Sequence, residues 1–177
     1  IYSISSPGYQ DVFDLHTRLF EIPVQSTSIK CEKLFFSRNK KVINTESRKV
    51  TNLDSLEEIF ESHGFKILDP GDLDLFQQIT LCRNATTLAG IHGGAFANIL
   101  FTNPDDKRAL IEIFPGKYIN GCFFHVGRAI QFKSHASICD PNLDFGNCGA
   151  GAEFFNNNVS TIASDDVNSA LSFTNTI

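Results

Sequence analysis

The chain has 177 residues, of which 42% are hydrophobic, and this is enough for one globular domain with a sizeable core. Its net charge of −5 argues against nucleic acid as a partner. No apolar run is long enough to span a bilayer, and no signal peptide is visible. Because the chain begins at Ile1 and contains no Met, we expect a fragment or a processed product.

The predicted elements alternate between strands and helices. In chain order they are helix 11–20, strand 33–37, a helix from Asp54 to Gly64, strand 65–68, helix 74–83, strand 87–91, helix 95–101, strand 109–114, helix 119–129 and strand 131–137. Asp54 and Glu57 have the spacing of a capping box, which predicts the start of the second helix. Leu75, Ile79 and Cys82 are expected to form the buried face of helix 74–83.

This alternation predicts right-handed βαβ units and an α/β fold, with a Rossmann-like three-layer parallel sheet. We expect a lead and linker helix over 1–30, the sheet domain over 31–140 and a loop-rich tail over 141–177 that packs on the same domain. Ligands bind at the carboxyl ends of the strands in such sheets. The positions of interest therefore follow the strands: Arg38, Asp69, residues 92–94 and residues 112–116.

The turn HGGAFAN, residues 92–98, joins a predicted strand to a predicted helix. Its two glycines allow a ligand to approach the backbone closely, and the first amides of the helix attract anions. The turn is thus a candidate phosphate site. A tight turn that needs glycine for steric reasons alone has the same sequence.

Charged residues add two further candidates. Seven of the fifteen basic residues lie between positions 30 and 49, which indicates either a local anion site or a solvated basic loop. Within this segment, Arg38 and Arg48 have the guanidinium groups that suit a diphosphate, although either could be an ordinary surface residue. Glu112 is placed where an acid binds ribose hydroxyls in nucleotide-binding α/β domains, or where a carboxylate is buried and hydrogen-bonded.

Several motif classes are excluded. The third glycine of the dinucleotide fingerprint is missing, which argues against NAD, and there is no Walker A lysine or G-x-S-x-G elbow. None of the five cysteines forms a CxxC pair, while Cys139 and Cys148 bracket a turn-rich loop and are candidates for a disulfide. The residues alone therefore indicate a phosphate- or nucleotide-binding α/β domain.

The order of motifs is more specific than any single one. The succession FFSR, RKVTNLDSLEEIFESHGFKIL, QQI, AGIHGGAFANILF and LIEIFP resembles glycosyltransferase family 61 over roughly residues 33–137. The matching residues are Ser37, Arg38, Arg48, Asn52, Gly64, Phe65, Gln78, His92, Gly93, Asn98, Phe101, Glu112 and Pro115. The chain has His-Gly-Gly-Ala-Phe where the family has His-Gly-Ala-Gly-Leu, and Leu53 and Lys49 replace an acid and a frequent arginine.

The resemblance implies the C-terminal, donor-binding half of a GT-B glycosyltransferase, with the N-terminal acceptor domain missing. Such an enzyme transfers a sugar from a UDP-sugar, with inversion, to a glycan or glycoprotein acceptor. Its location would be the Golgi or ER lumen in a eukaryote and the cytoplasm in a bacterium. Alternatives are a non-catalytic nucleotide- or phosphosugar-binding module and a flavodoxin-like domain that binds a flavin.

The resemblance also implies a set of ligand residues for the nucleotide sugar. They are Arg38, Arg48, Asn52, Gln78, His92, Gly93, Gly94, Ala95, Asn98 and Glu112, and His92 is also assigned a catalytic role. We expect no metal and no other cofactor. The one Asp-x-Asp spacing, Asp72 and Asp74, lies at the front of a predicted helix, where Asp is expected as a cap.

Overall fold

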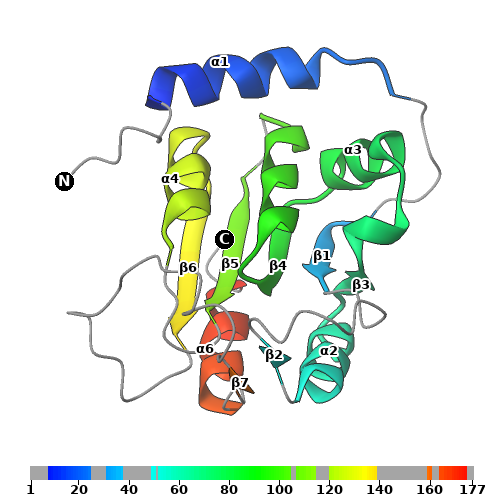
Figure 1. Ribbon diagram of the computed structural model, residues 1–177, viewed down its shortest axis with the longest axis vertical. Helices are drawn as coiled ribbons and strands as arrows, with labels where there is room; N and C mark the ends of the chain where they lie inside the picture. Colours follow the sequence, from blue (N-terminus) through cyan, green and yellow to red (C-terminus); the bar gives the residue numbers. More distant parts are fainter. Residues whose placement is uncertain are drawn as a thin grey trace.

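The computed structural model describes residues 8–24, 31–37, 49–50, 52–104, 107–114, 120–138, 159–160 and 164–174. Its main strands are β1 (Lys33–Phe36), β3 (Lys66–Leu68), β4 (Thr87–Ile91), β5 (Ala109–Phe114) and β6 (Lys133–Ile138). They form one all-parallel sheet in the order β3–β1–β4–β5–β6 (Figure 1). A separate parallel pair joins β2 (Lys49–Val50) to β7 (Val159–Ser160).

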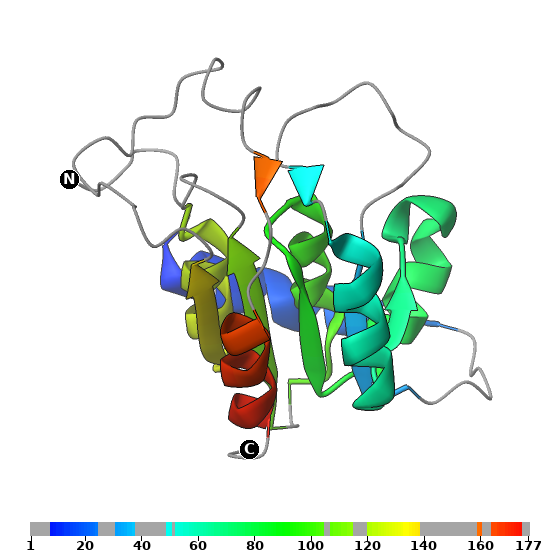
Figure 2. The same cartoon turned by 90° about the horizontal axis from the view of Figure 1, so that it is seen from below.

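Helices cover both faces of the sheet. The α-helices are α1 (Tyr9–Phe20), α2 (Leu53–Ser62), α3 (Leu75–Arg83), α4 (Cys122–Ala129) and α6 (Ser164–Thr174), and the 3₁₀ helices are η1 (Pro70–Asp72) and η2 (Gly94–Phe101). Figure 2 shows α2 and α6 on one side of the sheet and η2 and α4 on the other. The predicted α/β, Rossmann-like three-layer fold is therefore confirmed.

The alternation of side chains along the strands builds the two halves of the core. Phe35, Ala89 and Ile111 pack with residues of α2 and α6 on one face. Leu34, Leu88 and Leu110, each one position earlier, pack with α1, α3 and η2 on the other. This is the two-residue period of a strand, and burial of both faces is typical of parallel sheets.

Helix α1 is attached to the sheet through a buried polar cluster. The guanidinium of Arg108 donates to Thr102 Oγ1 at 3.1 Å and to the Ile130 carbonyl, and its Nη1 lies 3.2 Å from His16 Nε2. His16 Nε2 also lies 3.0 Å from the Thr102 carbonyl oxygen. Burial lowers the pKa of His16, the hydrogen bond with Thr102 opposes this effect, and the charge of Arg108 lowers the pKa further.

Three details differ from the sequence prediction. Helix α2 begins at Leu53 with Asn52 as N-cap and no side-chain cap bond, so the predicted capping box of Asp54 and Glu57 is wrong. Leu75 is 56% exposed because it lies in the first turn of α3, outside the buried part of that face. The helix predicted over 95–101 is a 3₁₀ helix. Gly64, with φ of +82°, ends α2 as expected.

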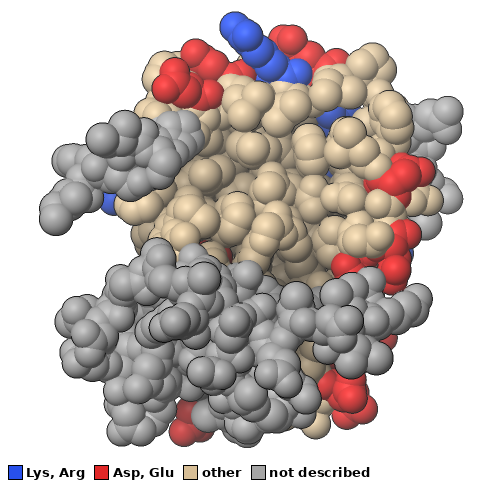
Figure 3. Space-filling view, in the orientation of Figure 1, with Lys and Arg blue, Asp and Glu red and all other residues tan. Residues whose placement is uncertain are grey.

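The outer surface of the η2, α4 and α1 layer is largely uncharged. In Figure 3 its centre contains neither basic nor acidic side chains, and the charges lie towards the margins. Tyr9 and Phe13 of α1 and Phe124 of α4 are exposed. No helix within the described part of the chain is long and apolar enough to cross a membrane.

Candidate functional site

The order of the strands creates a switch point between β1 and β4. The chain passes from β1 to β3 on one side of the sheet, and from β4 to β5 and β6 on the other. At such a point, the connections leave in opposite directions and open a crevice outside the carboxyl ends of the strands, where ligands of open α/β sheets bind.

A pocket of about 450 Å³ lies at this switch point. It is lined by Phe36, Ser37, Asp69, Pro70, Gly71, Gln78, Ile91, Gly93, Gly94, Ala95, Ala97 and Asn98. These residues come from the carboxyl ends of β1, β3 and β4 and from η1, α3 and η2. The volume is within the range of small-molecule sites.

Two glycines of the pocket region have different structural roles. Gly90 in β4 has φ of +156°, and a Cβ there would lie 2.5 Å from the Phe36 carbonyl oxygen, so the close approach of β1 and β4 needs glycine. At Gly94 an added Cβ would meet no atom of the described residues within 4 Å. The protein's own sterics therefore do not require glycine at the start of η2, where the open space borders the pocket.

Gln78 helps to shape the pocket. Its Nε2 donates to the carbonyls of Pro70 at 2.9 Å and Leu73 at 3.1 Å, which fixes the η1 turn. Asn98, also in the lining, is buried within η2. The pocket thus collects five of the predicted ligand residues: Gln78, Gly93, Gly94, Ala95 and Asn98.

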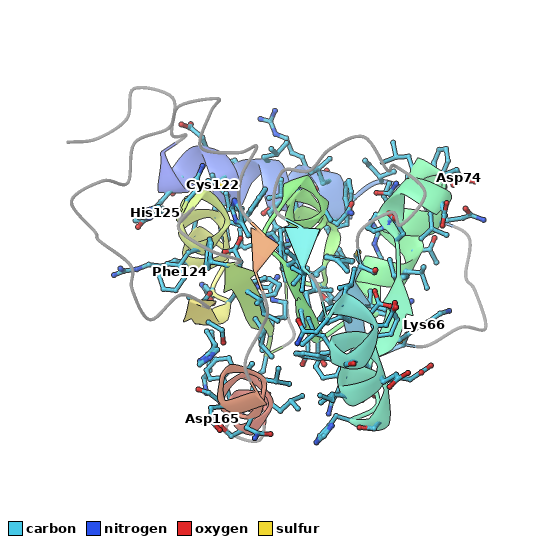
Figure 4. All side chains as sticks on the ribbon, turned by 60° about the horizontal axis from the view of Figure 1, so that its bottom comes forward. Lys66, Asp74, Cys122, Phe124, His125 and Asp165 are labelled. Carbon is cyan, nitrogen blue, oxygen red and sulfur yellow. The ribbon has the colours of Figure 1, made fainter. Side chains whose placement is uncertain are left out.

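His92 and Glu112 form a buried pair outside the pocket lining. His92 Nδ1 lies 2.5 Å from Glu112 Oε1, so the imidazole donates to the carboxylate, and the ring of Phe114 stacks on it with centroids 4.8 Å apart. Burial and the charge of Glu112 raise the pKa of the Cys122 thiol, at the start of α4 (Figure 4). The ribose role predicted for Glu112 stays a prediction, and the pocket lining does not support it.

The remaining predicted residues are separate from the pocket or not described. Asn52 is the half-buried N-cap of α2 and is not part of the lining. Arg38, Arg48, Cys139 and Cys148 lie outside the described residues. The predicted ligand set missed two lining residues that directly follow strands. These are Ser37, whose Oγ donates to Glu57 Oε1, and Asp69, which was among the strand-end positions of interest.

Of the Asp-x-Asp pair, Asp72 is exposed and Asp74 has a structural partner. Asp74 Oδ1 accepts from the backbone N–H of Gln77 at 2.8 Å and caps α3, as the sequence predicts, and it lies on the outer side of that helix (Figure 4). Within the described ranges, no group of three or more His, Cys, Asp or Glu side chains could hold a metal ion.

The fold and the pocket together define an open, all-parallel α/β domain with a candidate ligand site at the switch point. The sequence model of the family Glycosyltransferase 61 matches residues 4–109, more than half of the chain, and the chain belongs to this family. It is therefore a glycosyltransferase, as the sequence motifs predicted. The match includes every residue of the pocket lining. Among curated proteins, no match to the chain was found.

Proposed function

We propose that this domain binds a UDP-sugar in the switch-point pocket and transfers the sugar, with inversion, to a glycan or glycoprotein acceptor. It would be the C-terminal half of a GT-B enzyme, with the acceptor bound largely by another domain. The observation that carries the proposal is the pocket itself, because five ligand residues predicted from the sequence converge there.

The phosphate end of the pocket would be the start of η2. The amides of Gly94 and Ala95 lie in the first turn of this helix and border the pocket. Amides at such a position favour an anion. We propose that Arg38 and Arg48 add positive charge to the diphosphate, which would stabilise UDP as it leaves, the electrostatic effect on which group transfer depends most.

His92 would act beside this turn. It immediately precedes Gly93, and its pairing with Glu112 fixes the orientation of the ring. We propose that His92 contacts the phosphate or the sugar during transfer. In this role Glu112 acts through His92.

Replacing Gly94 with Val tests the pocket. The variant is expected to fold, because a Cβ at Gly94 meets no atom of the described residues within 4 Å. Its side chain would occupy the space meant for the diphosphate, and UDP affinity should fall about 100-fold or more, which is about 2.8 kcal/mol. Isothermal titration calorimetry measures the change, and circular dichroism checks the fold.

The control is Thr17→Val, which introduces the same residue type on the exposed side of α1 and should leave UDP affinity unchanged. A folded Gly94→Val protein with the affinity of the wild type would contradict the proposal. Binding of FMN in place of UDP by the wild type would instead favour a flavin-binding domain, since flavodoxin-like sheets share this strand order.

A further inference from the structure

The two ends of the pocket differ in charge. The amides at the start of η2 form one end, and the carboxylate of Asp69, which follows β3, forms the other. Among the described residues that line the pocket, Asp69 is the only charged side chain. A carboxylate repels phosphate, so the diphosphate of a bound nucleotide is favoured at the η2 end and disfavoured at Asp69.

The surrounding turn holds Asp69 in place. Its Oδ1 accepts from the backbone N–H of Gly71 at 2.8 Å, and Pro70 is buried at the first position of η1. The two hydrogen bonds from Gln78 to the carbonyls of Pro70 and Leu73 close the same turn from α3. The carboxylate is therefore preorganised at the edge of the pocket before any ligand binds.

Asp69 retains unused hydrogen-bonding capacity. Its Oδ2 is buried and has no hydrogen-bond partner among the described residues. A carboxylate has about four acceptor positions, of which the Gly71 amide uses one. Because the last torsion of Asp is broad, a small rotation can turn Oδ2 towards the pocket while Oδ1 keeps its hydrogen bond from the Gly71 amide. A buried carboxylate oxygen that accepts no hydrogen bond lowers the stability of the folded protein.

The spacing of the strands matches a nucleoside diphosphate. Asp69 follows β3 and Gly93 follows β4, with β1 between them. Two strand spacings separate these points by about 10 Å. A nucleotide with its phosphates on the η2 amides therefore extends its sugar across the end of β1 towards Asp69.

We propose that Asp69 binds the ribose diol of the donor nucleotide and thereby fixes which way the nucleotide lies in the pocket. The two carboxylate oxygens accept from the two neighbouring hydroxyls, while repulsion keeps the phosphates at η2. The inference rests on the proposed function and adds a specificity-determining residue to it. Asp69 replaces Glu112 as the acid that contacts the ribose.

The test combines one variant with three probes: UDP, 2′,3′-dideoxy-UDP and pyrophosphate. Asp69→Asn preserves the shape of the side chain and the acceptor for the Gly71 amide, so the turn remains. Its matched control is Asp72→Asn in the same turn, which is exposed and does not line the pocket. Calorimetry gives the affinities in EDTA and in Mn²⁺.

Asp69→Asn should weaken UDP binding roughly 10- to 100-fold, as expected for hydrogen bonds to a charged group. The wild type should bind 2′,3′-dideoxy-UDP more weakly than UDP by a similar factor. Asp69→Asn should bind these two nucleotides with nearly equal affinity. Pyrophosphate affinity should be unchanged or higher in Asp69→Asn, because a negative charge has been removed. Asp72→Asn should resemble the wild type with all three probes.

The inference would be overturned if replacing UDP with dideoxy-UDP lowered the affinity by the same factor in the wild type and in Asp69→Asn. It would also be overturned if Asp69→Asn lost UDP affinity only in Mn²⁺. If Asp69→Asn fails to fold, the wild type alone decides, since undiminished affinity for dideoxy-UDP excludes a diol contact. Tight UDP binding that Asp69→Asn leaves unchanged rejects this inference and leaves the proposed function standing. A wild type that does not bind UDP rejects both.

Discussion

At the scale of single residues, the His92–Glu112 pair shows how a polar contact fits into an apolar core. Both side chains are buried, they bond to each other, and the Phe114 ring stacks on the imidazole. Glu112 Oε2 has no partner among the described residues. The pair is therefore sensitive to loss of either member, because the one that remains would be buried without this hydrogen bond.

This pairing gives a prediction for stability. Glu112→Ala should lower the free energy of unfolding by about 3–5 kcal/mol, the usual cost of removing one partner of a buried pair. Replacing both residues with Leu should cost less than Glu112→Ala, because His92 is then not left buried beside the space that Glu112 occupied. Urea denaturation measures each value, and His125→Ala on the exposed side of α4 is the control. If the loss in the double variant, His92→Leu with Glu112→Leu, equals the sum of the losses in the two single variants, the two side chains do not act as a pair.

The residues of the site were predictable to different degrees. The glycines at 93 and 94 and Asn98 could be found because a strand, a glycine turn and a helix follow one another directly in the sequence. The contact between Glu112 and His92 could not be predicted in this way. The local sequence does not show whether the side chain of a strand residue faces a pocket or a neighbouring His. The contact between His16 and Arg108 joins residues 92 positions apart, and no local pattern encodes it.

At the scale of elements, the start of α3 shows a fully formed capping box. Asp74 Oδ1 accepts from the Gln77 N–H, and Gln77 Oε1 accepts from the Asp74 N–H at 2.9 Å. These bonds satisfy backbone groups that the helix itself cannot. The carboxylate at the front of this helix thus has a structural role.

Asp74→Ala is accordingly expected to lower the free energy of unfolding by about 1 kcal/mol. UDP affinity should not change, and it should be equal in EDTA and in Mn²⁺, because we propose that arginines and amides, and no metal, bind the diphosphate. Thermal unfolding and calorimetry measure the two effects. A gain of UDP affinity in Mn²⁺ that Asp74→Ala abolishes would instead assign Asp74 to a metal site.

Elements with strong patterns were predicted best. The bounds of β4 and β5 are those of their apolar runs, and both strands are buried along their whole length. The sequence predicted a helix over 95–101 without specifying its type, and the structure has the 3₁₀ helix η2 there. In the structure Phe96 and Ile99, three residues apart, are both fully buried, as the three-residue turn of a 3₁₀ helix allows. Packing on the sheet thus decides the helix type.

At the scale of the whole molecule, stability should depend on pH through His16. The pKa of His16 is lowered in the folded state, so the unfolded chain binds its proton more readily. The contribution of neutral His16 to the free energy of unfolding is therefore fully present above about pH 6.5 and is lost as the pH falls below this value. The free energy of unfolding changes by at most about 1.4 kcal/mol per pH unit in this range. Burial lowers the pKa of His135 as well, which acts in the same direction.

We expect the free energy of unfolding to fall between pH 7.5 and pH 5, and to fall less in His16→Gln. Urea denaturation at both pH values gives the comparison. Glutamine cannot take up a proton at the position between Arg108 and the Thr102 carbonyl. The same pH dependence in both proteins would mean that His16 is not the group that titrates.

The position of α6 in the chain has a consequence for synthesis. Val167, Ala170 and Leu171 complete the apolar face that also contains Ile111 and Ile113 of β5. These three residues are translated after every strand of the main sheet. A nascent chain can therefore pair all five main strands while part of one face still lacks its cover. In that interval we expect the uncovered part of this face to be open to aggregation until α6 emerges from the ribosome.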